Sequence, residues 1–368
     1  MIAVSDAWKA NQNGLIVSES FVEITFVGTD IVFNKSDITR YTHEQDGCLL
    51  SGKLPINKIT FSADNSRGKY NPNTTKFFEH QKITVRYGFT INGITEWIKA
   101  GTFYLTEWHT PNNGLETSFE ARDLLAFFMD KPYSGITSGS LKAVAENAVE
   151  QAGLPADAVV VLDSVLTKYH ATITTERSLA EVLQLCANAG CCVMWQDRDG
   201  ILRIQRISNV RKDGRVQHAF NMVSDYVIST GWAYSYPEYE ASKPLKSVKI
   251  SYGNNKVKGI SVGSVGETQS VSNELITIDT QADELARWAA ALLENKKTIS
   301  GEFRADPRLD IFDKVKVESK YGENEAVIIT NITYNFTGAF RCTYEGYVSN
   351  FDAITNAYYS GDLFAGEV

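Results

Sequence analysis

The side chains with the clearest catalytic potential in this sequence are four carboxylates within residues 107–123. Paired Asp or Glu residues on either side of a sugar are the catalytic machinery of most glycosidases. These four fall on or beside predicted strands, where acids that point to solvent are common without any catalytic role. We therefore expect no catalysis from Glu107, Glu116, Glu120 or Asp123.

A polar loop at residues 64–73, DNSRGKYNPN, offers Asp and Asn side chains that could bind calcium. It lacks the Asp-x-Asp-x-Asp-Gly series and the closing Glu of a calcium loop. Asp and Asn side chains also cap their own backbone in turns. We expect a structural turn here.

Histidine and cysteine form no recognisable metal site in the sequence. No CxxC pair is present, and the cysteine cluster at residues 186–192 lacks histidines at zinc spacing. We expect reduced, buried thiols, as in a protein that folds in a cytoplasm; they are Cys48, Cys186, Cys191, Cys192 and Cys342. The five histidines are scattered, and each is expected at the surface or its boundary: His43, His80, His109, His170 and His218.

Motifs for other chemistry are also missing. The sequence contains no P-loop, no HExxH and no GxSxG, and Gly259, Gly263 and Gly266 have the wrong spacing for a phosphate loop. We predict no catalytic, cofactor-binding or metal-binding residue, no cofactor, and no enzymatic activity. An aromatic cluster at residues 232–239 could stack sugars or bases, but Trp and Tyr are enriched at interfaces, so a buried or subunit-interface patch is expected.

Composition indicates a folded, soluble protein of several domains. The chain has 368 residues, of which 43% are hydrophobic and 22% charged, and its formal net charge is −8. Without a dense basic block, sequence-specific nucleic-acid binding is not expected. The sequence has no apolar run of about 18 residues that would span a membrane. Asp6 and Lys9 interrupt any signal peptide, so we expect a cytoplasmic protein that is not exported by a cleaved signal.

Hydrophobic periodicity predicts an all-β domain over residues 1–122 and an α/β module over residues 123–209. The first opens with a polar arm that carries Trp8. Its strands alternate apolar and polar residues, its Asn-Gly pairs at 92–93 and 113–114 are hairpin turns, and 43–47 is expected to be a loop. In the module, Ser140 caps a helix over 141–151, and Ser178 with Glu181 forms a capping box before a helix over 179–188.

Strands return after residue 209. We assign residues 210–255 and 298–350 to a second β domain, residues 256–297 to an insertion with a strand and a helix, and residues 351–368 to a loose tail. The closing strands echo the opening ones: ITFSAD at 59–64 and a strand at 82–85 resemble GEFRAD at 301–306 and a strand at 313–317. Chance similarity between two meanders is the alternative, but we favour an internal duplication.

Several motifs, in order, resemble the N-terminal region of phage tail baseplate hub proteins. They are ITFSADNSRGKYNPN, ITVRYGF, EWIKAGTFYLTEW and GLETSFEARDLL, all within residues 59–125, and RADPRLDIFD at 304–313 resembles a motif of the family's second ring domain. The resemblance implies an α+β, mainly β chain with two tube-like antiparallel β-barrel or sandwich domains, an inserted α/β module and a smaller helix-containing insertion.

The same resemblance implies a function and partners. It implies a homotrimer in the virion tail baseplate, assembled in the host cytoplasm, whose pseudo-sixfold ring joins the hexameric tail tube or distal tail proteins above to central spike, tip or fibre proteins below. An acidic ring suits a channel for DNA, because it would not bind the passing polyanion. Contractile and flexible tails, and virions and bacteriocins, stay open. The alternative is a carbohydrate-binding or cell-wall-degrading tail-tip module, with a cleft of Trp or Tyr and converging carboxylates.

Overall fold

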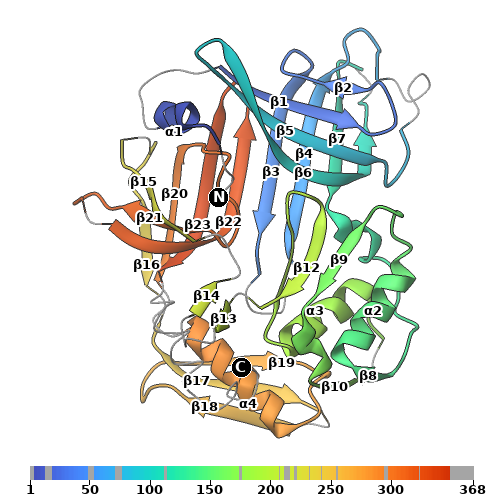
Figure 1. Ribbon diagram of the computed structural model, residues 1–368, viewed down its shortest axis with the longest axis vertical. Coiled ribbons are helices and arrows are strands. Elements are labelled where there is room, and N and C mark those ends of the chain that lie inside the picture. The colour runs from blue at the N-terminus through green and yellow to red at the C-terminus, as the bar shows by residue number, and fades with distance from the viewer. Residues whose placement is uncertain are drawn as a thin grey trace.

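The computed structural model describes residues 4–12, 19–48, 54–70, 77–111, 114–173, 176–206, 208–210, 216–218, 222–231, 233–241, 243–253, 256–293, 297–322 and 324–348. The chain is mainly β over these ranges, as the sequence predicts. Its largest sheet has 13 strands and is antiparallel except for one pair, and the other sheets have two or three strands. Two groups of strands lie side by side in the large sheet, with helices α2 (Leu141–Ala152), α3 (Leu179–Ala189) and α4 (Asp279–Leu293) and the small sheets below them (Figure 1).

The first group, here called the first β half, lies within residues 1–122, where the sequence predicts an all-β domain. Alternate residues of its strands are buried, which gives it one apolar face, as in β1. The strands are β1 (Glu19–Phe26), β2 (Val32–Phe33), β3 (Ile38–Asp46), β4 (Ile56–Asp64), β5 (Lys82–Ile91), β6 (Ile94–His109) and β7 (Glu116–Arg122).

The second group, the second β half, is assembled from segments that lie on both sides of an insertion. Its last four strands follow one another along the chain, whereas the first two come before the insertion. The strands are β15 (Met222–Ile228), β16 (Glu238–Ala241), β20 (Lys297–Arg304), β21 (Lys314–Glu318), β22 (Asn324–Phe336) and β23 (Phe340–Val348).

The two halves repeat one strand order. Neighbours in the first half run β3-β4-β7-β6-β5-β1, and neighbours in the second run β16-β20-β23-β22-β21-β15. Each of these strands of the first half thus has a counterpart in the second half, and the counterparts follow one another in the same order along the chain. The last pairs differ in direction, since β1 and β5 are antiparallel whereas β15 and β21 are parallel. The duplication that the sequence indicates is present in this topology.

A strained backbone position recurs in both halves just before the fourth repeated strand along the chain. His80 before β5 and Phe312 before β21 have φ values of 61° and 66°, a left-handed conformation that is uncommon for residues other than glycine. Each donates its N–H to a carbonyl in the long strand, His80 to Leu105 at 2.7 Å and Phe312 to Ile329 at 2.6 Å. Two unrelated meanders have no reason to share this detail.

The residue after each of these acceptors in the long strand is a threonine in both halves. Thr106 in β6 and Thr330 in β22 both lie at a register shift, where the strand gains a residue relative to its partner. Their hydroxyls donate to equivalent carbonyls of the exit strand, Thr106 to Glu120 at 3.1 Å and Thr330 to Glu345 at 3.3 Å. These bonds fix the structural alignment of the two halves.

One pair of strands joins the halves into a single sheet. β3 pairs antiparallel with β22, from Tyr41 opposite Phe336 to Asp46 opposite Asn331. The predicted loop at residues 43–47 is therefore wrong up to residue 46, because β3 runs through it. The inward positions of this strand include polar His43 and Gln45, both buried, so the apolar alternation that marks a strand is lost there.

Aromatic side chains from both halves fill the space behind this junction. The ring of Phe340 in β23 lies 4.9 Å from that of Tyr87 and 5.7 Å from that of Phe89, both in β5. The predicted polar arm is a short helix, α1 (Asp6–Gln12), and it buries Trp8 against Phe89 with ring centroids 4.8 Å apart. The two halves consequently share one core.

The α/β module carries the two helices predicted from capping. Helix α2 (Leu141–Ala152) begins after Ser140 and ends at Gly153 with φ 64°, and α3 (Leu179–Ala189) has the capping box of Ser178 and Glu181. They pack beside small sheets and 3-10 turns. These elements are η1 (Leu124–Phe127), β8 (Ser138–Ser140), β9 (Val159–Leu162), η2 (Ser164–Thr167), β10 (His170–Thr172), β11 (Val193–Gln196) and β12 (Ile201–Gln205); β13 (Ser208–Val210) and β14 (Val216–His218) follow.

The insertion is a lobe of three strands and one helix, and it includes a strand that the sequence assigns to the second β domain. That strand, β17 (Leu245–Tyr252), pairs with β18 (Lys256–Ser261) and β19 (Glu267–Ser272) in a separate sheet. Helix α4 (Asp279–Leu293) lies against them (Figure 1). A boundary at residue 255 would cut the β17–β18 hairpin, so the inserted lobe begins at β17.

Stability should depend on the junction between the halves. Ile332 in β22 is 1% exposed, and the change Ile332→Ala should lower the free energy of unfolding by about 2–5 kcal/mol through lost burial and a cavity. Urea denaturation measures this. The matched control is Ile94→Ala at a site that is 74% exposed, where the expected change is within about 0.5 kcal/mol. Equal effects of the two substitutions would contradict a shared core at the junction.

Candidate functional site at the junction of the two β halves

A hairpin turn of the α/β module inserts into the junction and places a buried arginine there. An Asp-Gly turn, residues 197–200, joins β11 to β12, and Gly200 has the positive φ of 86° that such a turn needs. Arg198 at its tip donates to the carbonyls of Lys99 at 3.3 Å and Pro307 at 2.7 Å, and also to that of Leu309. The Arg198 side chain thus links the α/β module, to which it belongs, to both β halves.

The charge of Arg198 is balanced by one carboxylate. Its Nε donates to Oδ2 of Asp310 at 3.1 Å, and the other oxygen of Asp310 accepts from the Gln45 amide at 2.9 Å. Burial is the largest single effect and would lower the pKa of the guanidinium, but the charge of Asp310, the neighbouring tyrosines and the hydrogen bond to Asp310 together raise that pKa. The arginine is therefore a fixed cation inside the protein.

A second group of buried polar side chains, in the first half, lies close enough to this ion pair to feel its charges. Nε2 of His43 lies 2.9 Å from Oδ1 of Asn57, so it donates, and Nδ1 accepts from the Tyr87 hydroxyl at 2.8 Å. The Tyr87 oxygen in turn accepts from Tyr41 at 2.9 Å. Each hydrogen-bonding atom of the imidazole has a partner, which makes His43 a neutral, structural side chain.

Burial governs the titration of His43. It lowers the pKa of the imidazole to about 4; the hydrogen bond to Asn57 opposes that effect and the positive charge of Arg198 adds to it. The expectation that every histidine lies at the surface or its boundary is thus wrong for His43, which is 1% exposed. The sequence pattern does not reveal the burial of His43, because it predicts a loop at residues 43–47 where β3 continues.

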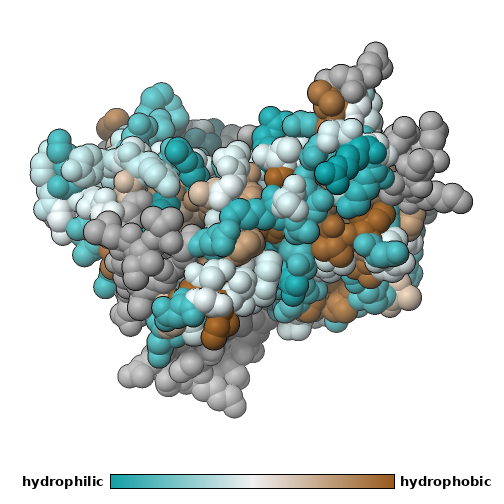
Figure 2. Space-filling model, turned by 90° about the horizontal axis from the view of Figure 1, so that it is seen from above, coloured by the Kyte–Doolittle hydropathy of each residue, from teal (hydrophilic) through white to brown (hydrophobic). Residues whose placement is uncertain are grey.

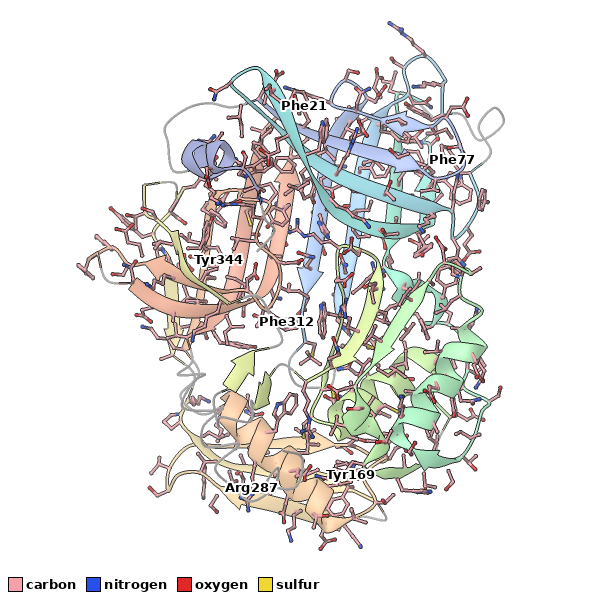
Figure 3. The ribbon with its side chains drawn as sticks, viewed as in Figure 1. Phe21, Phe77, Tyr169, Arg287, Phe312 and Tyr344 are labelled. Carbon is pink, nitrogen blue, oxygen red and sulfur yellow. The ribbon has the colours of Figure 1, made fainter. Side chains whose placement is uncertain are left out.

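Phe312 closes the same region from the second half, and Figure 3 shows it between the two β halves and the elements below. Its ring lies 6.0 Å from that of Trp195 in β11. A Cβ at Gly47 would come within 2.5 Å of the Phe312 ring, so only glycine fits at that point of the chain after β3. The junction is a close-packed contact among three parts of the protein.

The candidate carboxylates lie in different environments. Glu107 and Glu116 are exposed and Glu120 is half-buried, as expected for outward positions. Asp123 is instead buried and accepts from the N–H of Leu125 at 3.0 Å, so it caps a 3-10 turn. Burial raises its pKa to about 7, against the effect of that hydrogen bond. The expectation of a solvated acid is wrong for Asp123.

The polar loop after β4 is a turn, as predicted from its Asp and Asn residues. Asp64 accepts from the N–H of Ser66 at 2.9 Å, and Asn65 accepts from the N–H of Tyr70 at 2.7 Å. Tyr70 is buried against Phe33, with ring centroids 4.6 Å apart. Residues 71–73 of the predicted loop lie outside the described residues.

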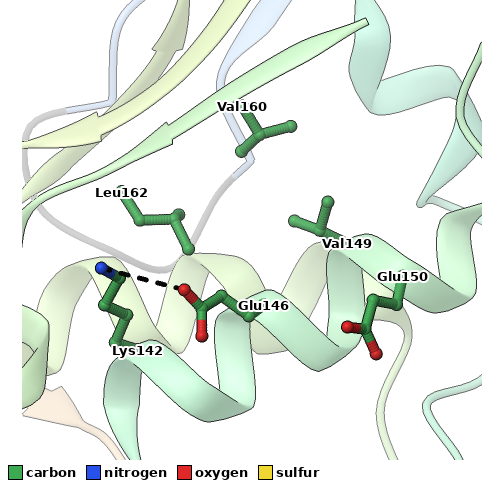
Figure 4. A pocket seen from close by; sticks show the side chains of 6 residues that line it. All are labelled: Lys142, Glu146, Val149, Glu150, Val160 and Leu162. Carbon is green, nitrogen blue, oxygen red and sulfur yellow. Dashed lines mark ion pairs between the residues drawn. The ribbon is translucent and has the colours of Figure 1, made fainter. Parts of the chain in front are cut away.

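Two open depressions are present on the described surface. One, of about 450 Å³, lies between α2 and β9, where Lys142 and Glu146 form an ion pair at 3.8 Å beside Val149, Glu150, Val160 and Leu162 (Figure 4). The other, of about 390 Å³, lies on the outer face of β3, β4, β6 and β7 and is lined by residues that include Trp108, Glu107 and Glu120. The two acids are direct cross-strand partners.

Metal-binding groups do not gather within the ranges that the structure describes, where no three His, Cys, Asp or Glu residues come together. Four of the five cysteines are buried, Cys48 is half-buried, and all five are thiols rather than disulfides. None of the described helices combines the length and the apolar character needed to cross a membrane. The side chain of His218 lies outside the described part.

The aromatic cluster is not buried, in contrast to one of the two expectations for it. Tyr234, Tyr236 and Tyr239 are all exposed along and just before the edge strand β16, with cations near their rings, whereas Trp232 lies outside the described residues. At the far end of the first half the surface is largely hydrophilic, with hydrophobic side chains gathered toward one side (Figure 2). Exposed apolar residues of that half are Val27, Val32, Phe78, Ile94 and Leu115.

Comparison with solved structures shows that the chain has the fold of phage tail proteins. A tail protein from Neisseria meningitidis MC58 superposes with a TM-score of 0.61 at 12% identity, over 91% of this chain and 99% of that one. The 43 kDa tail protein of prophage MuSo2 from Shewanella oneidensis gives 0.59 at 14% identity, over 91% and 99%. The prophage tail protein gp18 from Listeria monocytogenes EGD-e gives 0.53 at 10% identity, over 95% and 100%.

Sequence comparison adds nothing to this likeness, since no family model and no curated protein matches the chain. The near-complete coverage of all three tail proteins means that the α/β module and the inserted lobe belong to the shared fold together with the two β halves.

Acid should weaken the junction through His43. Its folded pKa of about 4 is below the unfolded value of 6.5, so the unfolded chain takes up the proton first and stability is lost as pH falls from about 6.5 to about 4. The loss should be on the order of 3 kcal/mol. Urea denaturation of the wild type and of His43→Gln from pH 7 to pH 4 isolates this contribution, and the stability difference between them should fall with pH. A constant difference would count against a buried neutral imidazole.

Proposed function

We propose that this chain is the structural baseplate hub of a phage tail or phage-tail-like particle. Three copies form a ring in which the two β halves of each copy act as tube-like domains, so that six similar units surround the axis. The observation that carries the proposal is the repeated six-strand order within one chain, on a fold shared with phage tail proteins. The ordered motifs within residues 59–125 support the hub in particular.

A repeated unit suits a protein that stands between assemblies of different symmetry. The hexameric tail tube above presents six equal contacts, and a trimer with two similar units per chain can meet all six. The same trimer offers threefold contacts to a central spike, tip or fibre below. Val27 and Phe78, exposed apolar side chains near the start of β5, are candidates for one of these contacts.

The remaining parts have supporting roles in this proposal. The α/β module and the lobe of β17–β19 and α4 lie on one side of the large sheet (Figure 1), where they can brace the ring from outside. No catalytic step is assigned to the chain, which acts as a structural protein of the tail, assembled in the host cytoplasm. The acidic total charge suits a ring through which DNA passes without being bound.

Symmetry is the direct test of the hub. Image reconstruction of the assembled particle should show threefold symmetry at this protein, with six β units around the channel. The mass of the purified chain at high concentration, or in complex with its neighbours, should be that of three copies. A strict monomer in solution together with a particle in which this protein has sixfold symmetry would rule the proposal out.

A second function, carbohydrate binding or cell-wall hydrolysis at the tail tip, has one observation in its favour. The 390 Å³ depression combines Trp108 with two adjacent carboxylates, Glu107 and Glu120. If it were a glycosidase site, the isolated chain would lyse cell walls and Glu120→Gln would abolish lysis. We expect no lysis and no glycan retention by the wild type, because in the hub this strand end serves assembly. Lysis that Glu120→Gln abolishes and Glu116→Gln leaves intact would favour the second function.

A further inference from the structure

We infer that the chain joins its neighbours in the ring by repeating, between copies, the strand pairing that joins its own two halves. The inference rests on the proposed ring and specifies its interface. Its partner is a second copy of this chain, which offers the free end of β6 in its first half to the edge strand β16 of the next copy's second half.

The internal junction uses two strands whose counterparts have no such partner among the described strands. Within the chain, β3 of the first half pairs with β22 of the second. By strand order β16 is the counterpart of β3, and β6 is the counterpart of β22. β16 ends the path of the large sheet, and its strand pairing in the described part is to β20. The pairing of β3 with β22 thus makes one junction inside the chain. Their counterparts, β16 and β6, are left to form an equivalent junction with another copy.

The open part of β6 corresponds to the part of β22 that receives β3. In the second half, one side of β22 is hydrogen-bonded to β21 and the residues before it up to Ile329, and to β3 from Asn331 onward. In the first half, β5 accompanies β6 up to Leu105, through the equivalent bonds of His80 and Gln81. From Glu107 to Thr110 the same side of β6 has no strand beside it within the described ranges. An edge of this kind is a template for another strand.

The structural alignment of the halves predicts the register. Glu345 and Thr330 correspond to Glu120 and Thr106, and the ladders on either side then make Glu240 the counterpart of Glu44. The same ladders make His109 the counterpart of Thr333. Since Glu44 lies opposite Thr333 inside the chain, Glu240 of one copy should lie opposite His109 of the next. Ala241 would then face Trp108, and Tyr239 would face Thr110.

Burial supports this pairing. At the internal junction the inward side chains are covered completely: Tyr41, His43 and Tyr334 are at most 1% exposed. At the free edges the corresponding face is open, with Tyr239 39% exposed and Trp108 half-buried. The inferred pairing would cover the side chains of Tyr239 and Trp108. It would thus give the exposed aromatic side chain on β16 a role in assembly, whereas a monomer offers no reason for that exposure. Head-to-tail pairing of this kind closes into a ring when its rotation allows.

Disulfide trapping tests the register directly. The variant His109→Cys/Glu240→Cys places two cysteines on opposed positions of the inferred junction, within reach of a disulfide. Mild oxidation of the oligomer or of assembled particles should link most of the chain covalently into dimers and trimers, with the ladder ending at three. The matched control is Glu44→Cys/Thr333→Cys, the same pair inside the chain, which should close within one chain and leave the denatured mass that of a monomer.

Further controls separate the possible outcomes. The single variants report any background from Cys48, and His109→Cys/Glu238→Cys, which is shifted by two residues, should link poorly. If the particle has threefold symmetry and the internal pair closes but His109 and Glu240 do not link, the edge pairing is wrong and the hub stands. Links that continue beyond three copies would keep the pairing and overturn the closed trimer.

Hydrogen exchange gives a second readout without substitution. Those amides of Glu107–Thr110 and Glu238–Ala241 that point away from β7 and β20 should exchange more slowly in the oligomer than in the monomer, because only they can form the new ladder hydrogen bonds. Unchanged exchange at both segments in a trimer would overturn the inference even if the cysteine variants failed to fold.

Discussion

The buried guanidinium of Arg198 is the interaction on which the rest of this structure depends. It is held by a tight turn of the α/β module and satisfied by carbonyls of both β halves and by the carboxylate of Asp310. A buried charge without partners costs several kcal/mol, so the turn, the two halves and Asp310 must stay together. The polar residues around it follow from the same demand, because Gln45 completes the bonding of Asp310.

This constraint explains why the two β halves act as one rigid body although each repeats the strand order of a separate unit. A plain duplication would give two units that could hinge about the segment between them. Here β3 and β22 form a continuous ladder, an aromatic core lies behind it, and the module turn is inserted at its end. In the proposed ring, each subunit would therefore hold its two β halves in fixed relative positions.

Duplication also explains which surfaces remain open. A chain of two similar units joined edge to edge necessarily ends in two unused edges of the same types as those it has joined. Most β proteins protect such edges with charge, proline or short strands. In this chain β16 is short and carries Glu238 and Glu240, and Pro111 follows the open end of β6. These features limit indiscriminate pairing while leaving room for one specific partner.

The sequence by itself determined what depends on local pattern. The Asn-Gly hairpin at 92–93, the helices that begin at Leu141 and Leu179 and the turn at Asp64 follow from turn chemistry, capping and periodicity, which act within a few residues. The ordered motifs indicated tail proteins, and the echo between 59–64 and 301–306 indicated the repeat. The echo, however, aligns Phe61 with Phe303, whereas the ladders align Phe61 with Gly301, a shift of one strand period that keeps the same face.

Only the tertiary structure decided the junction. His43 and Gln45 are polar residues at buried positions, and a sequence pattern places such residues outside because their partners, Asn57 and Asp310, are not visible in it. The placement of β17 in its own sheet likewise depends on pairing with β18 and β19 rather than on its own residues. Strand partners and buried polar networks are fixed by contacts between distant parts of the chain, and local pattern carries no record of them.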